Sequence, residues 1–318
     1  MKRFFLLIRY TYIILIIFGT NRMSTAQDKK SYIIKPISNE TYNALLQFYQ
    51  YDKDIPFELN IIESLENESY KREKIVFTGI NNSRVTGFLA IPKTGEPPYP
   101  CVLQMHGLNV SKNDFWEEEY HHGRLVTQGL LSSGYAVLAL DMPYHGERSY
   151  ENDFESALIT LFKKGWGYRI RDMVVQSTIE YRRALDYLGT RAEIDSNRIG
   201  ALGYSLGSVI TLILTGVDDR VKTSVACATA IIKPRTFFPP EQYLSGFAPQ
   251  SFVRYYKNKS ILIVAGKNDE FNCTIAEAEQ LYSLIESSNK ELIFYDSGHK
   301  LPPEHSTKVV EWLLKNLK

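Results

Sequence analysis

The sequence predicts an α/β fold: a doubly wound, mostly parallel sheet of about eight strands with helices on both faces. Three observations predict it. Short apolar runs alternate with stretches of helical spacing, a G-x-S-x-G pentapeptide stands between one such run and a helical stretch, and two later runs end beside an aspartate and a histidine. We therefore expect one large catalytic domain over residues 73–318, with its chemistry at the carboxyl edge of the sheet.

The predicted domain begins with an antiparallel hairpin, in which residues 73–78 and 84–91 flank a polar, glycine-containing turn. Before it, residues 27–72 are polar with scattered apolar positions and predict a helical extension. Parallel strands are expected at 101–105, 135–140, 198–202, 222–228, 260–265 and 291–295. A helix at 170–188 and a closing helix carry apolar residues at helical spacing. This alternation favours parallel construction with right-handed crossovers.

The pentapeptide Gly203-Tyr-Ser205-Leu-Gly207 is the most informative motif. A strand, a sharp G-x-S-x-G turn and a helix form the setting of a nucleophile elbow, which exposes its serine hydroxyl at the edge of the sheet. The glycines suit the turn because a Cβ at either position would clash with neighbouring elements. The bare pentapeptide is also compatible with an ordinary strand-to-helix turn, so the rest of the chain must decide.

Chain order supports a catalytic triad. In this architecture the acid and then the base follow the serine, each at the end of a later strand. The run 260–265 ends beside Asp269, and the run 291–295 ends beside His299. Each residue alone has a simpler interpretation, a helix cap or a solvated loop histidine, but the order and placement together predict Ser205 as nucleophile, His299 as base and Asp269 as acid.

The loop after the strand at 101–105 predicts an oxyanion hole. His106 and Gly107 follow this strand at once, and the second backbone donor in such sites comes from this loop. We expect the amides of Leu108 and Leu206 to hold the oxyanion. His106 precedes the serine in sequence, so we interpret it as a structural residue that braces the loop.

On these residues the chain resembles the α/β-hydrolases, and among them the dienelactone-hydrolase-like and acetyl-xylan-esterase and prolyl-peptidase-like serine hydrolases. The resemblance covers roughly residues 73–318 and is carried by His106-Gly107, 134–146, 195–200, 203–207, 266–269 and 297–299. One departure matters, because dienelactone hydrolases proper have cysteine at the elbow where this chain has Ser205. The resemblance implies a serine hydrolase and leaves the substrate open.

Composition excludes several classes of partner. The net charge is +1, from 37 basic and 36 acidic residues that are mixed along the chain, so no nucleic-acid partner is expected. Of the three cysteines, Cys101 and Cys227 lie in apolar runs and are expected to be buried, and Cys273 lies near a helix start. His121-His122 lacks further ligands at metal-site spacing and predicts the polar start of a helix. We expect no metal, cofactor or disulfide framework.

The N-terminus has the pattern of a signal peptide. Lys2 and Arg3 supply positive charge, residues 10–19 form a short apolar core, and Ser24-Thr-Ala26 precedes a possible cleavage point. We expect residues 1–26 to be removed, leaving an exported protein, periplasmic or secreted, without stable membrane insertion; the alternative is an uncleaved anchor.

The sequence contains six N-x-S/T sequons. Those at Asn109 and Asn272 flank the predicted oxyanion and Asp269 loops, where a glycan would obstruct catalysis. This placement favours chance sequons in an unglycosylated bacterial protein.

Two long connections leave the carboxyl edge of the sheet, at 144–167 and 231–256. The second is rich in aromatic residues: Phe237, Phe238, Tyr243, Phe247, Phe252, Tyr255 and Tyr256. We interpret it as a partial cap whose rings face the substrate, with ordinary packing of a long loop as the alternative.

The function that these features predict is hydrolysis of a carboxylic ester, with a small acyl group and a small-molecule or carbohydrate alcohol as substrate. A prolyl-oligopeptidase-like peptidase is a second hypothesis, although residues 37–72 are too few for the large extra domain such enzymes carry. A catalytically silent binding protein of the same fold is the third. The sequence does not predict an oligomeric state.

Overall fold

The computed structural model describes residues 32–117, 121–162, 167–234 and 245–318. Within it, residues 33–318 form one compact unit. The predicted signal peptide lies outside the described residues, so it stays a prediction. In the four described ranges, no helix is both long and apolar enough to cross a membrane.

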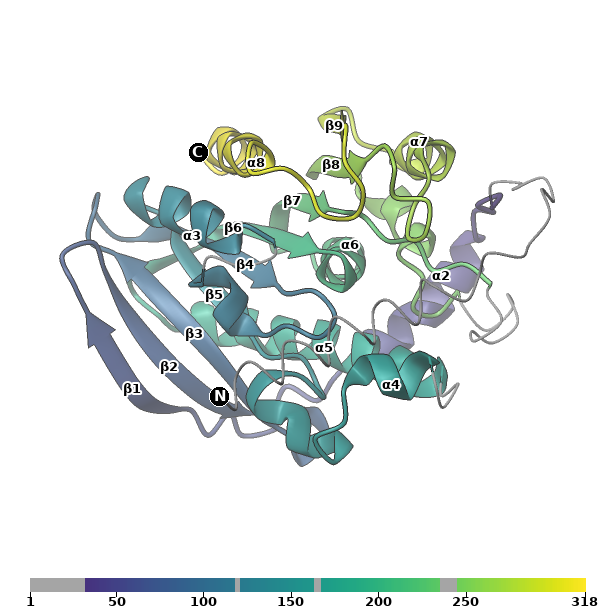
Figure 1. Cartoon of the computed structure of the whole chain (residues 1–318). Helices are drawn as coiled ribbons and strands as arrows, with labels where there is room; N and C mark the ends of the chain where they lie inside the picture. The colour runs from purple at the N-terminus through teal and green to yellow at the C-terminus, as the bar shows by residue number, and fades with distance from the viewer. Residues whose placement is uncertain (1–31, 118–120, 163–166, 235–244) are drawn as a thin grey trace, which may run out of the picture. The chain divides into compact units, whose positions relative to one another are not determined.

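A single mixed sheet of nine strands organises this unit (Figure 1). Its order is β1-β2-β3-β5-β4-β6-β7-β8-β9, with antiparallel pairing up to β5 and parallel pairing from β5 onward. The strands are β1 (Asn60–Glu66), β2 (Tyr70–Thr78), β3 (Arg84–Pro92), β4 (Tyr99–Met105), β5 (Ala136–Leu140), β6 (Ile194–Tyr204), β7 (Val221–Cys227), β8 (Ser260–Gly266) and β9 (Lys290–Tyr295). This topology confirms the predicted fold class, including the antiparallel hairpin and the parallel run.

Helices cover both faces of the sheet. The α-helices are α2 (Asn39–Leu46), α3 (Gly123–Ser132), α4 (Ala157–Phe162), α5 (Gly167–Leu188), α6 (Leu206–Val217), α7 (Ile275–Leu284) and α8 (His305–Asn316). Two hydrophobic cores result, one shared with α5 and α6 and the other with α3 and α8. Successive residues of β4 point to opposite cores, Cys101 and Leu103 to the first and Val102 to the second. The nucleophile and the acid therefore follow strands whose ends are buried on both faces, β6 and β8, whereas the base follows the half-buried edge strand β9.

Strand β1 corrects the predicted helical extension. Residues 39–46 form helix α2 and residues 47–49 a short 3-10 turn, but residues 60–66 form an edge strand paired with β2. All seven side chains of β1 are exposed. The strand therefore has no buried face that would leave a period-two apolar pattern in the sequence, and backbone pairing with β2 defines it.

Candidate active site

The elbow places Ser205 between β6 and α6 in a strained conformation. Its φ is 55° and its ψ is −114°, a region that non-glycine residues rarely adopt. A Cβ on Gly203 would lie 2.1 Å from the carbonyl oxygen of Gly207, and one on Gly207 would lie 1.9 Å from that of Met105. Both glycines are therefore required by close backbone contacts, as a sharp strand-to-helix turn demands.

The structure brings the predicted triad residues together from three separate strands. The hydroxyl of Ser205 lies 2.8 Å from His299 Nε2, and His299 Nδ1 lies 2.6 Å from Asp269 Oδ2. Asp269 follows β8 and is buried, whereas His299 follows β9 and keeps about a quarter of its side chain exposed. In this arrangement Nδ1–H donates to the carboxylate and Nε2 accepts from the serine, the tautomer that a general base needs.

Asn272 joins this arrangement, a role that sequence reasoning missed. Its side-chain amide donates to Asp269 Oδ1 at 3.1 Å and lies 2.9 Å from His299 Nδ1, while its backbone N–H donates to Asp269 Oδ1 at 3.2 Å. The amide thus fixes the carboxylate that faces His299. A glycan on this asparagine would displace these contacts, in line with the interpretation of its sequon as a chance one. The signal in the sequence that could have indicated this role was an asparagine three residues after the catalytic acid, because such side chains bond to nearby groups in a turn.

The predicted oxyanion loop starts against the elbow. The close approach of Gly207 to the carbonyl oxygens of Met105 and His106 holds the end of β4 beside the nucleophile, and Gly107 and Leu108 follow directly. His106 Nδ1–H donates to the Gly107 carbonyl at 2.8 Å, and its Nε2 accepts from the Met142 amide at 3.1 Å. Burial lowers the pKa of His106, so the ring stays neutral in this tautomer. His106 thereby links the loop to the segment after β5.

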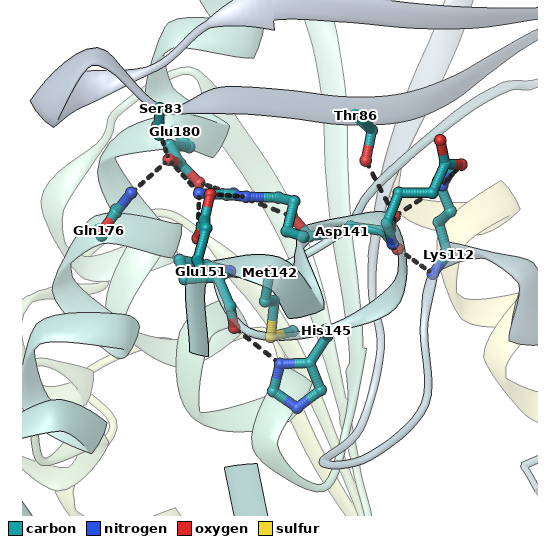
Figure 2. Close-up of polar contacts among 12 residues, drawn as sticks. Ser83, Thr86, Lys112, Asp141, Met142, His145, Glu151, Gln176 and Glu180 are labelled. Atoms are coloured by element: carbon teal, nitrogen blue, oxygen red, sulfur yellow. Dashed lines mark hydrogen bonds and ion pairs between the residues drawn. The ribbon is translucent and has the colours of Figure 1, made fainter. Parts of the chain in front are cut away.

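A buried ionic network continues from this loop (Figure 2). Lys112 Nζ lies 2.6 Å from Asp141 Oδ2 and 2.7 Å from Glu147 Oε1, and Thr86 Oγ1 donates to the same Asp141 oxygen at 2.9 Å. Burial would raise the pKa of Asp141, but the Lys112 ammonium outweighs it and the pKa is lowered. Lys112 and Asp141 are fully buried, so the pair fixes the chain just beyond the oxyanion loop.

A glycine completes the turn after β5. Gly146 has a φ of +54°, and a Cβ there would lie 2.4 Å from Asp141 Oδ1. His145-Gly146 is therefore structural, as the sequence indicated.

The prediction of an aromatic cap over the substrate is wrong for the aromatic residues that the structure describes. Phe247, Phe252 and Tyr256 are fully buried, and the two phenylalanines belong to the core beneath α5 and α6. Tyr255 stacks on Tyr42 of α2, with ring centroids 3.4 Å apart. These rings pack inside the protein because the segment that carries them lies against helix α6, where the hydroxyl of Tyr256 donates to the carbonyl oxygen of Leu212. The predicted rings at positions 237, 238 and 243 lie outside the described residues.

The two adjacent histidines and the three cysteines that the sequence analysis discussed are part of the folded structure and form no separate site within the described ranges. His121 Nδ1 lies 2.7 Å from Asp114 Oδ2, and His122 precedes helix α3 in a left-handed conformation. Cys101 and Cys227 are buried as expected, and Cys273 is buried too; all three are free thiols. Among the described residues, no group of three or more histidine, cysteine or acidic side chains could hold a metal ion.

Buried histidines near the site predict a loss of stability in acid. Burial lowers the pKa of His145 to about 3, whereas an unfolded histidine titrates near pH ~6.5. Between these values the unfolded chain binds a proton that the folded protein excludes. The free energy of unfolding should therefore fall as the pH drops below ~6.5, by up to about 1.4 kcal/mol per pH unit for this residue. Urea unfolding at pH 7 and pH 5 should show a smaller fall for His145→Gln, and equal falls would contradict the assignment.

Comparison with known proteins agrees with the geometry. A model of the family described as acetyl xylan esterase (AXE1) matches residues 33–231. The hydrolase YtaP of Bacillus subtilis is 28% identical over 177 residues, which cover 54% of this chain and 56% of YtaP. Esterase FrsA of Serratia proteamaculans is 28% identical over 163 residues, which cover 51% of this chain and 33% of FrsA. The matched part thus spans about half of the first relative and a third of the second.

Two solved structures share the fold. Acetyl xylan esterase 1 from Thermoanaerobacterium sp. superposes with a TM-score of 0.67 at 17% identity, covering 88% of this chain and 93% of that one. The acetyl xylan esterase from Paenibacillus sp. R4 gives a TM-score of 0.64 at 19% identity, covering 87% and 93%. At these identities the likeness establishes the fold alone.

Proposed function

The chain belongs to the acetyl xylan esterase family, and from this premise we propose that it is a serine hydrolase that cleaves carboxylic esters with small acyl groups, acetyl foremost. The observation that carries the proposal is the continuous path from Ser205 Oγ through His299 to Asp269, with contacts of 2.8 and 2.6 Å. The description of the matched family and the name of the relative FrsA support an ester as the substrate.

Acylation begins with attack by Ser205 on the ester carbonyl. A serine hydroxyl is not ionised near neutral pH, so His299 Nε2 takes its proton as the new C–O bond forms. Asp269, held by Asn272, keeps His299 in the required tautomer and stabilises the imidazolium. The negative charge that develops on the carbonyl oxygen is met by the amides of Leu206, at the start of α6, and Leu108. Each such donor contributes about 3 kcal/mol to lowering the barrier.

Collapse of the tetrahedral intermediate breaks the bond to the alcohol. The alcohol leaves with the proton from His299 and an acyl group remains on Ser205. Water then attacks this acyl-enzyme, giving its proton to His299, and the acid is released as Ser205 is protonated again.

The acyl preference predicts the result of an ester series. With p-nitrophenyl acetate, butanoate and octanoate, we expect kcat/KM to be highest for acetate. We also expect p-nitroacetanilide, the amide of the same acyl group, to be cleaved far more slowly, which separates an esterase from the peptidase hypothesis. Comparison with the uncatalysed rate in buffer provides the baseline. Fastest turnover of octanoate, or equal rates on ester and anilide, would overturn this substrate class.

A further inference from the structure

The nucleophile and the base lie on strands that do not touch in the sheet. Ser205 follows β6 and His299 follows β9, and β7 and β8 stand between them. No direct backbone pairing between β6 and β9 therefore sets the distance from Ser205 Oγ to His299 Nε2. The acid and base loops are different, because their strands are neighbours and Asn268 N–H donates to the Ser297 carbonyl at 2.9 Å.

Tyr204, the residue before the nucleophile, bridges this gap with its side chain. Its hydroxyl donates to the carbonyl oxygen of His299 at 2.8 Å and accepts from the backbone N–H of Leu301 at 2.9 Å. The hydroxyl thus binds both sides of Lys300 in the loop that carries the base. Tyr204 and Leu301 are buried, so water does not readily replace these bonds.

The ring of Tyr204 is itself held in place. It packs in the core between the sheet and helices α3 and α8, with the ring of His121 at 4.1 Å and that of His305 at 6.0 Å. His299 lies edge-on to it at 6.1 Å. Because Tyr204 and Ser205 are adjacent in the chain, a rigid Tyr204 side chain fixes the position of the base loop relative to the elbow.

We propose that Tyr204 is a positioning residue for the base: its hydroxyl holds the main chain of His299 so that the imidazole stays within hydrogen-bond distance of Ser205. This inference rests on the proposed function. The inference gives the residue at the second position of the G-x-S-x-G motif a role, which is to set the position of the loop that carries His299 relative to the elbow.

The test compares Tyr204→Phe with wild type. The phenylalanine keeps the ring but leaves the His299 carbonyl and the Leu301 amide without their partner, so the base loop relaxes. Because small misplacements of reacting groups cost up to about 100-fold in rate, we expect kcat on p-nitrophenyl acetate to fall about 10- to 100-fold with KM nearly unchanged. The rate of modification by a fluorophosphonate, which needs the same base, should fall in parallel.

Tyr135→Phe is the matched control. The hydroxyl of Tyr135 also bonds a backbone oxygen in the same core, that of Leu314 at 3.3 Å, but it lies at the far end of α8 from the site. We expect this variant to keep the kcat of wild type at a temperature well below both melting points. A merely structural role of Tyr204 would lower Tm and leave kcat unchanged, and that result would overturn the inference.

Hydrogen–deuterium exchange of the wild type tests the contact without any variant. The Leu301 amide should be strongly protected, and in Tyr204→Phe that protection should be lost. If the Leu301 amide of the wild type exchanged at the rate of an open loop, this would contradict its hydrogen bond to Tyr204, even if the variant failed to fold.

If the wild type neither hydrolyses p-nitrophenyl acetate nor reacts with the fluorophosphonate, the proposed function fails and the inference fails with it. An active wild type with an equally active Tyr204→Phe rejects the inference alone.

Discussion

Replacing Ser205 by alanine is expected to abolish ester turnover, lowering kcat on p-nitrophenyl acetate by about four to six orders of magnitude. The reason is that Ser205 Oγ forms the acyl-enzyme in this mechanism, and a triad without its nucleophile retains only the contributions of binding and the oxyanion hole. The fold should survive, since within the described residues the hydroxyl of Ser205 hydrogen-bonds to His299 Nε2 alone.

The matched control is Ser283→Ala, an exposed serine on α7 whose hydroxyl bonds only to its own helix. It should keep full activity, and both variants should melt near the wild-type temperature. Turnover of Ser205→Ala at the wild-type rate would remove Ser205 from the mechanism, and loss of the folded state would leave the loss of activity to be explained by unfolding.

Replacing Arg148 by methionine is expected to lower the free energy of unfolding by about 3–5 kcal/mol, the largest effect on stability that the structure predicts. The guanidinium of Arg148 is fully buried and lies 2.5 and 3.0 Å from the two carboxylate oxygens of Glu180. Without it, the negative charge of Glu180 is left in the interior, where its donors among the described residues are the neutral side chains of Ser83 and Gln176. Urea unfolding measures the change.

Two further variants decide whether the buried charge is the cause. Adding Glu180→Gln to Arg148→Met removes the uncompensated charge of Glu180 and should restore part of the lost stability, while the charge of Glu151, which also binds Arg148, remains. Arg254→Met breaks an exposed pair with Glu286 and should cost less than about 1 kcal/mol. If Glu180→Gln lowered the free energy of unfolding as much in the Arg148→Met variant as it does in the wild type, the two substitutions would act independently. The pair would then not be the source of the effect.

Much of the fold could be predicted because its central strands, such as β4, β5 and β8, are buried on both faces. Their apolar runs, such as Cys101 to Met105, stand out from the polar segments between them, and chain order then assigns the loops to one edge of the sheet. Ser205, Asp269 and His299 could be selected for the same reason, since each lies shortly after the end of an apolar run. Strand β1 carries no such signal, because all its side chains are exposed.

The parts that sequence did not predict depend on contacts between distant residues. The partner of Tyr204 lies 95 positions along the chain at His299, and that of Arg148 lies 32 positions along at Glu180. Neither pairing leaves a periodic pattern. Phe252 and Tyr256 show a pattern that predicted a contact which does not form. The many aromatic residues of the segment 231–256 indicated a cap over the substrate, but composition does not reveal which side of a segment faces the core. Both residues are buried.

Fluorophosphonate labelling of the purified wild-type protein, followed by mass spectrometry of its peptides, tests the central claim most directly. The reagent modifies a serine only when a base activates it and an oxyanion site receives the phosphoryl oxygen. The geometry around Ser205 predicts one adduct per chain, on the peptide that contains this residue, and none on Ser205→Ala. A folded wild-type protein that stays unlabelled, or an adduct on a different serine, would contradict the account of this site.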